Sequence, residues 1–159
     1  MINLWKYESP LGQITMAGEG EALVGLWLEG QKHFASTLGP DATEGWLPVF
    51  DEVKRWLDIF FNGTEPGFTP RLDLRGTSFR QAVWKELLTI PYGETVSYGE
   101  LARRVGTSPR AIGGAVGHNP VSIIVPCHRV IGTDDSLTGY AGGLDFKARL
   151  LQLENRADR

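Results

Sequence analysis

Residues 97–117 read SYGELARRVGTSPRAIGGAVG, and this stretch carries start and stop signals for two short helices. Ser97 can cap the first helix, and Gly106 is suited to end it because glycine tolerates a left-handed backbone. Ser108 followed by Pro109 signals a second start, with a capping hydroxyl and a proline at the first helical position. Two short helices joined by a tight glycine turn predict a helix-turn-helix.

The region before this stretch has the pattern of an antiparallel sheet followed by a helix. Alternating side chains between turn signals predict strands at residues 4–7, 13–17 and 23–28. Apolar residues recur at nearly helical spacing over residues 47–61, which predicts an amphipathic helix ending at an Asn-Gly pair. Residues 68–74 are consistent with a further strand.

A break with the sequence RGTS at residues 75–78 predicts a boundary between two domains, residues 1–75 and residues 76–159. The hydroxyl residues of the break can cap a following helix. The apolar face of that helix would consist of Phe79, Val83, Trp84, Leu87 and Leu88.

Two elements are expected after the helix-turn-helix. Residues 121–125 are uniformly apolar apart from one serine and predict a buried strand, and residues 144–154 predict an amphipathic helix. The fold class is therefore α/β in the broad sense, of the α+β kind. A small N-terminal domain with an antiparallel sheet precedes a helix-rich C-terminal domain.

Composition and charge narrow the possible function classes. The 159 residues include 42% hydrophobic and 22% charged side chains, which excludes a disordered chain and a coiled coil. Neither a bilayer-spanning apolar run nor a secretory signal pattern is present, so a cytoplasmic protein without membrane contact is expected. The formal net charge is -3, but residues 1–75 carry -5 and residues 76–159 carry +2, and the window 96–133 carries +3. A polyanion responds to that local charge rather than to the total.

Cys127 is the single cysteine, which excludes a disulfide framework and a multi-cysteine zinc site. It is followed directly by His128, at the end of the predicted strand. A reactive thiol needs a base or positive charge nearby, and that base is typically oriented by a carboxylate. A lone cysteine is also often an inert buried residue, so both interpretations stay open at this point. The candidate carboxylates are Glu154, Asp134, Asp135 and Asp145.

The segment Pro126-Cys127-His128-Arg129-Val130 resembles the active-site signature of the O6-alkylguanine-DNA alkyltransferases, or methylated-DNA–protein-cysteine methyltransferases. Four other segments resemble motifs of this family in the same order. They are VSYGELA at 96–102, RAIGGAVGHNP at 110–120, LTGYAGGL at 137–144 and the closing helix at 147–154. The resemblance is continuous over residues 76–155 and looser in the N-terminal half, for which it implies a ribonuclease H-like domain.

The resemblance implies a methylated-DNA–[protein]-cysteine S-methyltransferase that acts in DNA repair. Such a protein moves an alkyl group from guanine O6 in duplex DNA to its cysteine, irreversibly and once per molecule. O4-alkylthymine stays open as a second substrate. The implied partner is double-stranded DNA carrying the lesion, bound by a monomer without a cofactor. Some members hold a structural zinc in the N-terminal half, but here that half has one histidine, His33, and no cysteine, so no metal is expected.

The catalytic roles carry over residue by residue. Cys127 would be the alkyl acceptor, and His128 the base that acts through a bridging water. Glu154 would orient the histidine, and Asn119 would brace the active-site turn. Tyr98 would assist protonation of the departing guanine and shape its pocket; without the resemblance, it would be read as a packing residue between the two short helices.

Further residues would contact the base and the duplex. The backbones of Cys127 and Val130 and the loop at Ala141 would hold the guanine edge, and Tyr140 would lie against the flipped base. Arg110 would enter the stack in place of that base. The small residues of the second short helix would allow it to lie in the narrow minor groove. With Arg129, the expected DNA contacts are Arg110, Ala111, Gly113, Gly114 and Ala115. In two departures, Ala141 replaces a frequent serine, and the spacing of 12 from Tyr98 to Arg110 is shorter than in many members.

Three other interpretations compete with alkyl transfer. A non-catalytic relative that binds alkylated DNA and recruits repair factors would lack the cysteine, so Cys127 argues against it. A thiol hydrolase needs a base facing the sulfur and an oxyanion hole, and adjacent Cys-His suits the first need poorly. A helix-turn-helix regulator reads the major groove with long polar side chains, which the Ala/Gly face after Arg110 does not provide.

Overall fold

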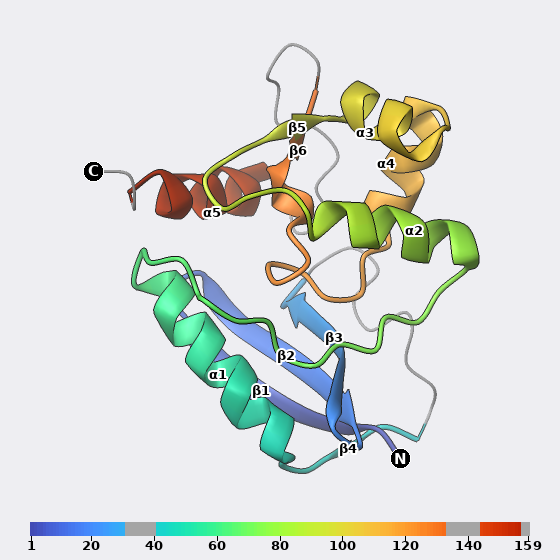
Figure 1. Cartoon of the computed structure of the whole chain (residues 1–159). Helices are drawn as coiled ribbons and strands as arrows, with labels where there is room; N and C mark the ends of the chain where they lie inside the picture. The colour runs from blue at the N-terminus through green and yellow to red at the C-terminus, as the bar shows by residue number, and fades with distance from the viewer. Residues whose placement is uncertain (31–40, 133–143, 157–159) are drawn as a thin grey trace.

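The computed structural model describes residues 1–30, 41–132 and 144–156 (Figure 1). The N-terminal half is a twisted sheet with one long helix on one face, and the C-terminal half consists mainly of helices. The predicted α+β class, with a sheet domain followed by a helical one, is confirmed. None of the helices in the described ranges is long and apolar enough to cross a membrane.

The sheet has the strand order β3-β2-β1-β4. Its members are β1 (Asn3–Ser9), β2 (Gly12–Glu19), β3 (Ala22–Leu28) and the short β4 (Thr43–Glu44). The first three pair antiparallel, and β4 runs parallel to β1. All three predicted strands form, because each alternating segment is bounded by a turn that reverses the chain.

Helix α1 (Pro48–Phe61) lies across one face of this sheet (Figure 1). It begins at a proline and ends before Gly63, whose φ of +80° is the left-handed conformation that glycine tolerates. Its buried side chains join the same core as the inward side chains of β2 and β3. They are Val49, Phe50, Val53, Trp56, Leu57 and Phe60.

The C-terminal half contains four helices, one 3₁₀ turn and a two-stranded parallel pair in its described residues. These elements are α2 (Ser78–Leu87), β5 (Val96–Ser97), α3 (Tyr98–Val105), α4 (Pro109–Gly117), η1 (Cys127–Arg129), β6 (Val130–Ile131) and α5 (Leu144–Arg156). The two predicted short helices and their caps are confirmed. The Ser97 side chain accepts from the Glu100 N–H, Ser108 accepts from Ala111, and Gly106 has a φ of +86°.

Two predicted strands are not strands. Residues 121–125 form a buried turn with one isolated bridge to β3, because the Asn119 side chain binds backbone groups that a strand would use for pairing. Residues 68–74 are extended but make a single bridge, between Leu72 and Leu23. The predicted apolar face of α2 is also partly wrong, since Phe79 and Leu88 are exposed.

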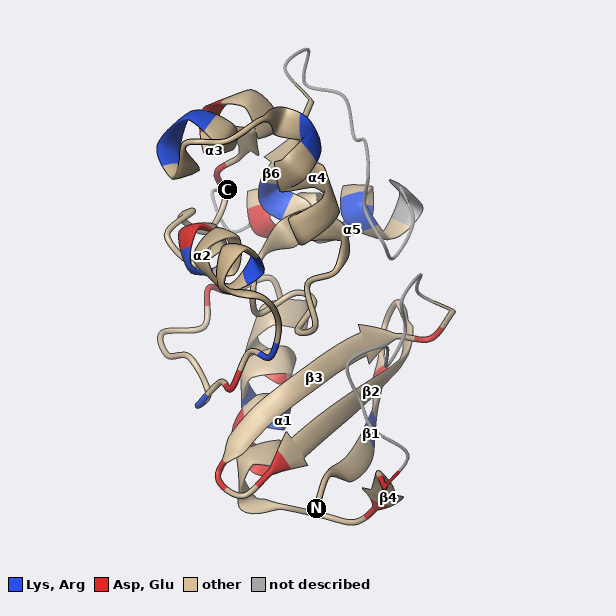
Figure 2. Cartoon of the chain, turned by 90° about the vertical axis from the view of Figure 1, so that its right-hand side faces the viewer, with Lys and Arg blue, Asp and Glu red and all other residues tan. Residues whose placement is uncertain are grey.

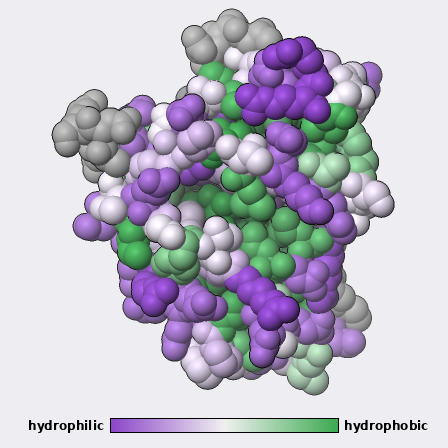
Figure 3. Space-filling view, in the orientation of Figure 1, coloured by the Kyte–Doolittle hydropathy of each residue, from purple (hydrophilic) through white to green (hydrophobic). Residues whose placement is uncertain are grey.

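The two halves meet along a continuous apolar core. Leu26 and Phe60 from the first half share this core with Val83 and Leu150 from the second. Between them, at the surface, is a cavity of about 180 Å³ whose wall includes Arg129. Figure 3 shows apolar residues in a hollow at this level of the molecule. Side chains from both sides of residue 75 therefore belong to one apolar core.

Candidate active site

Cys127 lies in a 3₁₀ turn rather than at the end of a strand. Cys127 is only 4% exposed, and its N–H donates to the Val125 carbonyl at 2.8 Å. Directly after the turn, the N–H of Val130 donates to the Cys127 carbonyl, and Val130 pairs with Val96 of β5. The nucleophile candidate is therefore held by backbone bonds on both sides.

Asn119 is hydrogen-bonded to the segment before Cys127, the turn that the resemblance implies it would brace. Its side chain is buried, its Nδ2 donates to the Val125 carbonyl at 2.9 Å, and its Oδ1 accepts from the Val121 N–H at 3.0 Å. Because the carbonyl of Val125 also accepts from Cys127, Asn119 acts on the same atom that fixes the cysteine backbone.

His128 and Glu154 are both fully buried and directly bonded, with 2.5 Å between Nε2 and Oε2. The carboxylate can only accept while ionised, so this contact places the imidazole proton on Nε2. Nδ1 of His128 is buried and has no hydrogen-bond partner among the described residues. The histidine thus keeps one unprotonated nitrogen that could receive a proton.

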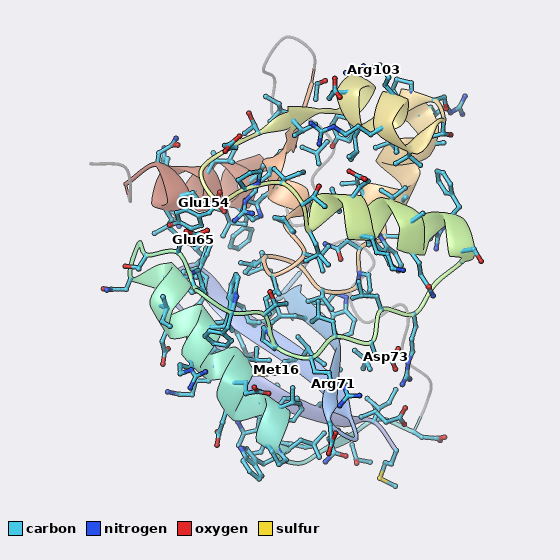
Figure 4. The ribbon with its side chains drawn as sticks, in the orientation of Figure 1. Met16, Glu65, Arg71, Asp73, Arg103 and Glu154 are labelled. Carbon is cyan, nitrogen blue, oxygen red and sulfur yellow. The ribbon has the colours of Figure 1, made fainter. Side chains whose placement is uncertain are left out.

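Of the four candidate carboxylates, Glu154 is the one whose side chain the structure describes, and it bonds to His128. Asp134 and Asp135 lie outside the described residues, and the side chain of Asp145 is not described. Glu154 comes from α5, and Figure 4 shows it on the side of the helical half that faces α1.

Arg129 lies inside the protein, which corrects the prediction that it contacts DNA. Its Nε and Nη2 donate to Glu154 at 2.9–3.1 Å, and its Nη1 donates to the Ile90 carbonyl at 2.7 Å. The guanidinium also lies over the ring of Tyr92, 5.6 Å from its centroid. Sequence alone could not separate this arginine from a surface one, because its counter-charge lies 25 residues further along the chain.

The charge states of His128 and Glu154 suit His128 to accept a proton. Burial lowers the pKa of His128, and the neighbouring Glu154 only partly offsets this effect, so the imidazole is neutral near pH 7. Burial opposes ionisation of Glu154, but hydrogen bonds from His128 and Arg129 outweigh it and lower the pKa of that carboxyl. A neutral base next to a charged carboxylate is the arrangement that general base catalysis needs.

Lys147 belongs to the same site, although the sequence motifs identified it only as the start of a helix. It is fully buried on α5, and its Nζ lies 5.7 Å from the centroid of the Tyr98 ring. Burial lowers its pKa to about 8, while charge on Cys127 acts in the opposite direction. Burial, and then charge on Cys127, raise the pKa of Tyr98 to about 12.

A signal for Lys147 was present in the sequence. Lys147, Leu150 and Glu154 follow the spacing of one helix face, and all three are fully buried. Two charged residues on the apolar face of an amphipathic helix indicate a polar site beneath that helix.

Comparisons with known proteins identify the family of the chain. Residues 78–156 match the DNA-binding domain of 6-O-methylguanine DNA methyltransferase, and residues 5–74 match its ribonuclease-like domain. A methylated-DNA–protein-cysteine methyltransferase of Mycobacterium tuberculosis is 48% identical, over 97% of this chain and 93% of the relative. The chain belongs to this family.

Two further relatives extend the similarity. A methylated-DNA–protein-cysteine methyltransferase of Haemophilus influenzae is 43% identical over 93% of this chain and 83% of its own length. The crystal structure of Mycobacterium tuberculosis OGT in complex with DNA superposes with a TM-score of 0.88 at 46% identity. That match covers 98% of this chain and 94% of the other.

Some of the residues predicted to face DNA are exposed in the structure, and others are buried. Arg110 and Gly114 are exposed, and Ala111 and Gly113 are half-buried. An added Cβ at Gly113 or Gly114 would meet no atom within 4 Å, so this face of α4 is open. Ala115 is buried instead, and its carbonyl accepts from the Trp84 indole at 2.8 Å, which corrects the prediction that it lies on the DNA face.

Basic residues gather on the helices of this half (Figure 2). Arg103 and Arg104 both pair with Glu100 on α3, and Figure 4 shows Arg103 at the end of the molecule far from Glu154. The predicted base-contacting residues Tyr140 and Ala141 lie outside the described residues. No cluster of three or more metal-ligating side chains occurs within the described ranges.

Replacing Arg129 distinguishes the interior role from a DNA contact. Arg129→Gln removes the counter-charge of a buried carboxylate, so we expect the free energy of unfolding to fall by about 3 kcal/mol or more in urea titrations. Arg104→Gln, at a surface ion pair, is the matched control and should change it by less than about 1 kcal/mol. Folded Arg129→Gln should bind duplex DNA as the unsubstituted protein does. Weaker DNA binding at unchanged stability would contradict the interior assignment.

Proposed function

We propose that this protein repairs O6-alkylguanine in double-stranded DNA by moving the alkyl group to the Sγ atom of Cys127. The observation that carries the proposal is the buried Cys127 turn next to a His128–Glu154 pair whose Nδ1 is unbonded, in a chain of this family. The relatives of similar sequence are named methylated-DNA–protein-cysteine methyltransferases, and OGT of Mycobacterium tuberculosis has been crystallised with DNA.

The reaction is an in-line displacement at the alkyl carbon. The S–C bond forms as the O6–C bond breaks, and the guanine departs with the electron pair of that bond. The thiol proton passes to Nδ1 of His128 through a bridging water, and Glu154 stabilises the imidazolium that results. No step regenerates the thiol, so each molecule acts once.

Tyr98 stabilises the departing guanine by donating a hydrogen bond to it, and the proton that the guanine gains comes from the imidazolium of His128 through water. Burial and the nearby cysteine raise the pKa of Tyr98 to about 12, so the phenol stays protonated at neutral pH and can donate a hydrogen bond. Lys147 supports the Cys127 thiolate, because below pH 8 its ammonium group places a positive charge close to the sulfur.

DNA binding is assigned to the outer face of α4. A lesion stacked in a duplex cannot reach a cysteine that is 4% exposed, so the nucleotide must be flipped out. Arg110 begins this helix on the exposed side and would fill the space left in the stack. Gly113 and Gly114 present no side chains, which suits close approach to the minor groove.

The remaining assignments complete the proposal. We infer a helical domain at residues 76–159 that carries the chemistry and a sheet domain at residues 1–75 that supports it. The protein would act in the cytoplasm as a monomer with neither cofactor nor metal, and O4-alkylthymine would be a second possible substrate for the same pocket.

Mass spectrometry tests the transfer directly. After incubation with O6-methylguanine duplex DNA, the tryptic peptide containing Cys127 should gain the mass of one methyl group, with at most one adduct per molecule. Cys127→Ser is the control and should bind the DNA without gaining mass. A protein that binds the lesion but never acquires the adduct would support the recruiting function instead.

Arg110→Ala tests base flipping. We expect the rate of methyl transfer from duplex DNA to fall by about a hundredfold, since flipping costs a few kcal/mol that the arginine offsets. The rate with the free O6-alkylguanine base, which needs no flipping, should change less than about threefold. Arg103→Ala, an exposed arginine paired with Glu100, is the control. Equal losses on both substrates would exclude a flipping role for Arg110.

Lys147→Met tests the electrostatic support of the thiolate. Loss of the ammonium removes a positive charge that favours the thiolate form of Cys127, so the acid limb of the rate–pH profile should move up by roughly one unit. Lys147 is charged below its pKa of about 8, so the two profiles should differ most near pH 7 and converge above pH 8. Lys147→Arg should keep the original limb, and Lys85→Met on the exposed side of α2 should have no effect. An unmoved limb in Lys147→Met would contradict this role.

A further inference from the structure

Ile123 has a φ of +72°, and among the described residues no other non-glycine residue has a positive φ. This conformation is strained for an L-residue with a branched Cβ. The Ile124 N–H donates to the Ser122 carbonyl at 2.8 Å, which closes a three-residue γ-turn around Ile123. A γ-turn with φ near +75° is the rare, strained form. Ile123 is fully buried, so the strain persists inside the core.

The chain before this turn is fixed to the edge of the N-terminal sheet. Leu26 of β3 donates its N–H to the Pro120 carbonyl at 2.8 Å and accepts from the Ser122 N–H at 2.9 Å. Through these two bonds, Leu26 of β3 forms a single bridge with Val121 of the helical half. Figure 1 shows β3 pointing into that half.

The chain after the turn is fixed to the nucleophile. The Val125 carbonyl accepts from both Asn119 Nδ2 and the Cys127 N–H, at 2.9 and 2.8 Å. Ile123 therefore lies between two anchored segments, one belonging to the sheet and one to the cysteine turn. Reversing the chain within three residues is what allows both sets of bonds to form together.

We propose that Ile123 is a positioning residue for alkyl transfer: its left-handed γ-turn transmits the position of the β3 edge to Cys127. Strained conformations persist where the surroundings over-determine them, and they concentrate at active sites. The apolar side chain anchors the turn in the core, and the bonds of Leu26 and Asn119 hold the segment that enters it. The inference rests on the proposed function only for its rate measurement.

Two substitutions at Ile123 separate the backbone conformation from the side chain. Ile123→Ala and Ile123→Gly both remove the apolar side chain, but only glycine adopts a positive φ without strain. We expect Ile123→Gly to melt roughly 2–4 °C above Ile123→Ala, the reverse of the usual order. The same pair at Ile124, which is also buried and has no positive φ, is the control and should show alanine above glycine.

The rate of methyl transfer tests positioning at a temperature well below both melting transitions. Ile123→Ala should react about tenfold more slowly than the unsubstituted protein, because its turn can relax and displace the thiol. Ile123→Gly, which keeps the turn, should recover most of that loss. The loss should be equal on duplex DNA and on the free O6-alkylguanine base, since Cys127 is the shared reactant. DNA affinity should stay unchanged.

The melting temperatures and the rates together show whether the left-handed turn exists and whether it positions the thiol. Alanine above glycine in melting temperature at Ile123 would show that the left-handed turn is not maintained by the fold. Reversed melting temperatures with unchanged rates would show that the turn is structural and does not position the thiol. A failure of the proposed function itself is distinguishable, because the unsubstituted protein would then show no transfer while the melting order still held.

Discussion

The carboxylate of Glu154 connects three parts of the helical half that are distant in sequence. It accepts from His128 and Arg129 in the catalytic turn and from the Gly93 N–H in the segment that leads to α3. Because it is buried, its charge must be balanced by these donors. Without it, His128 would lose the partner that sets its tautomer, and Arg129 would become an unpaired buried cation. The position of α5 and the chemistry of the turn therefore depend on one another.

A second constraint comes from the sheet. Edge strands leave unpaired N–H and carbonyl groups, and β3 satisfies its groups at Leu26 with the segment that leads to Cys127. Through Leu26, the N-terminal half fixes the starting point of the segment that leads to Cys127. A sheet edge is a stiff reference, because its strand is also paired along β2.

The sequence predicted those features whose causes are local. Ser97, Gly106 and Ser108 act within a few residues of themselves, so α3 and α4 form where their caps predict. The sequence predicts a strand at residues 121–125, which is wrong because the apolar composition is the same in either conformation and the deciding contact comes from the Asn119 side chain. The roles of Cys127, His128 and Glu154 came from the resemblance to a family rather than from residue pattern alone.

The inward positions of Arg129 and Ala115 were not predictable for a related reason. Each depends on a partner from another element, Glu154 for the arginine and the Trp84 indole for the alanine carbonyl. A charged residue can be buried only when an opposite charge lies next to it in the fold. Sequence patterns do not show which residues become neighbours in space. The same reasoning applies to Lys147, whose helix face is visible in the sequence but whose neighbours Tyr98 and Cys127 are not.

These positions also change the electrostatic interpretation of the DNA-facing half. The +3 window at residues 96–133 includes Arg129, which is neutralised inside the protein by Glu154, and it includes Arg103 and Arg104, which share Glu100. Arg110 is exposed at the start of α4, and no ion pair to it is found within the described part of the chain. A surface with few uncompensated charges binds phosphates weakly and with a shallow salt dependence. Such binding allows the protein to leave undamaged sites quickly, and the selectivity must then come from flipping and from the pocket rather than from affinity for the backbone.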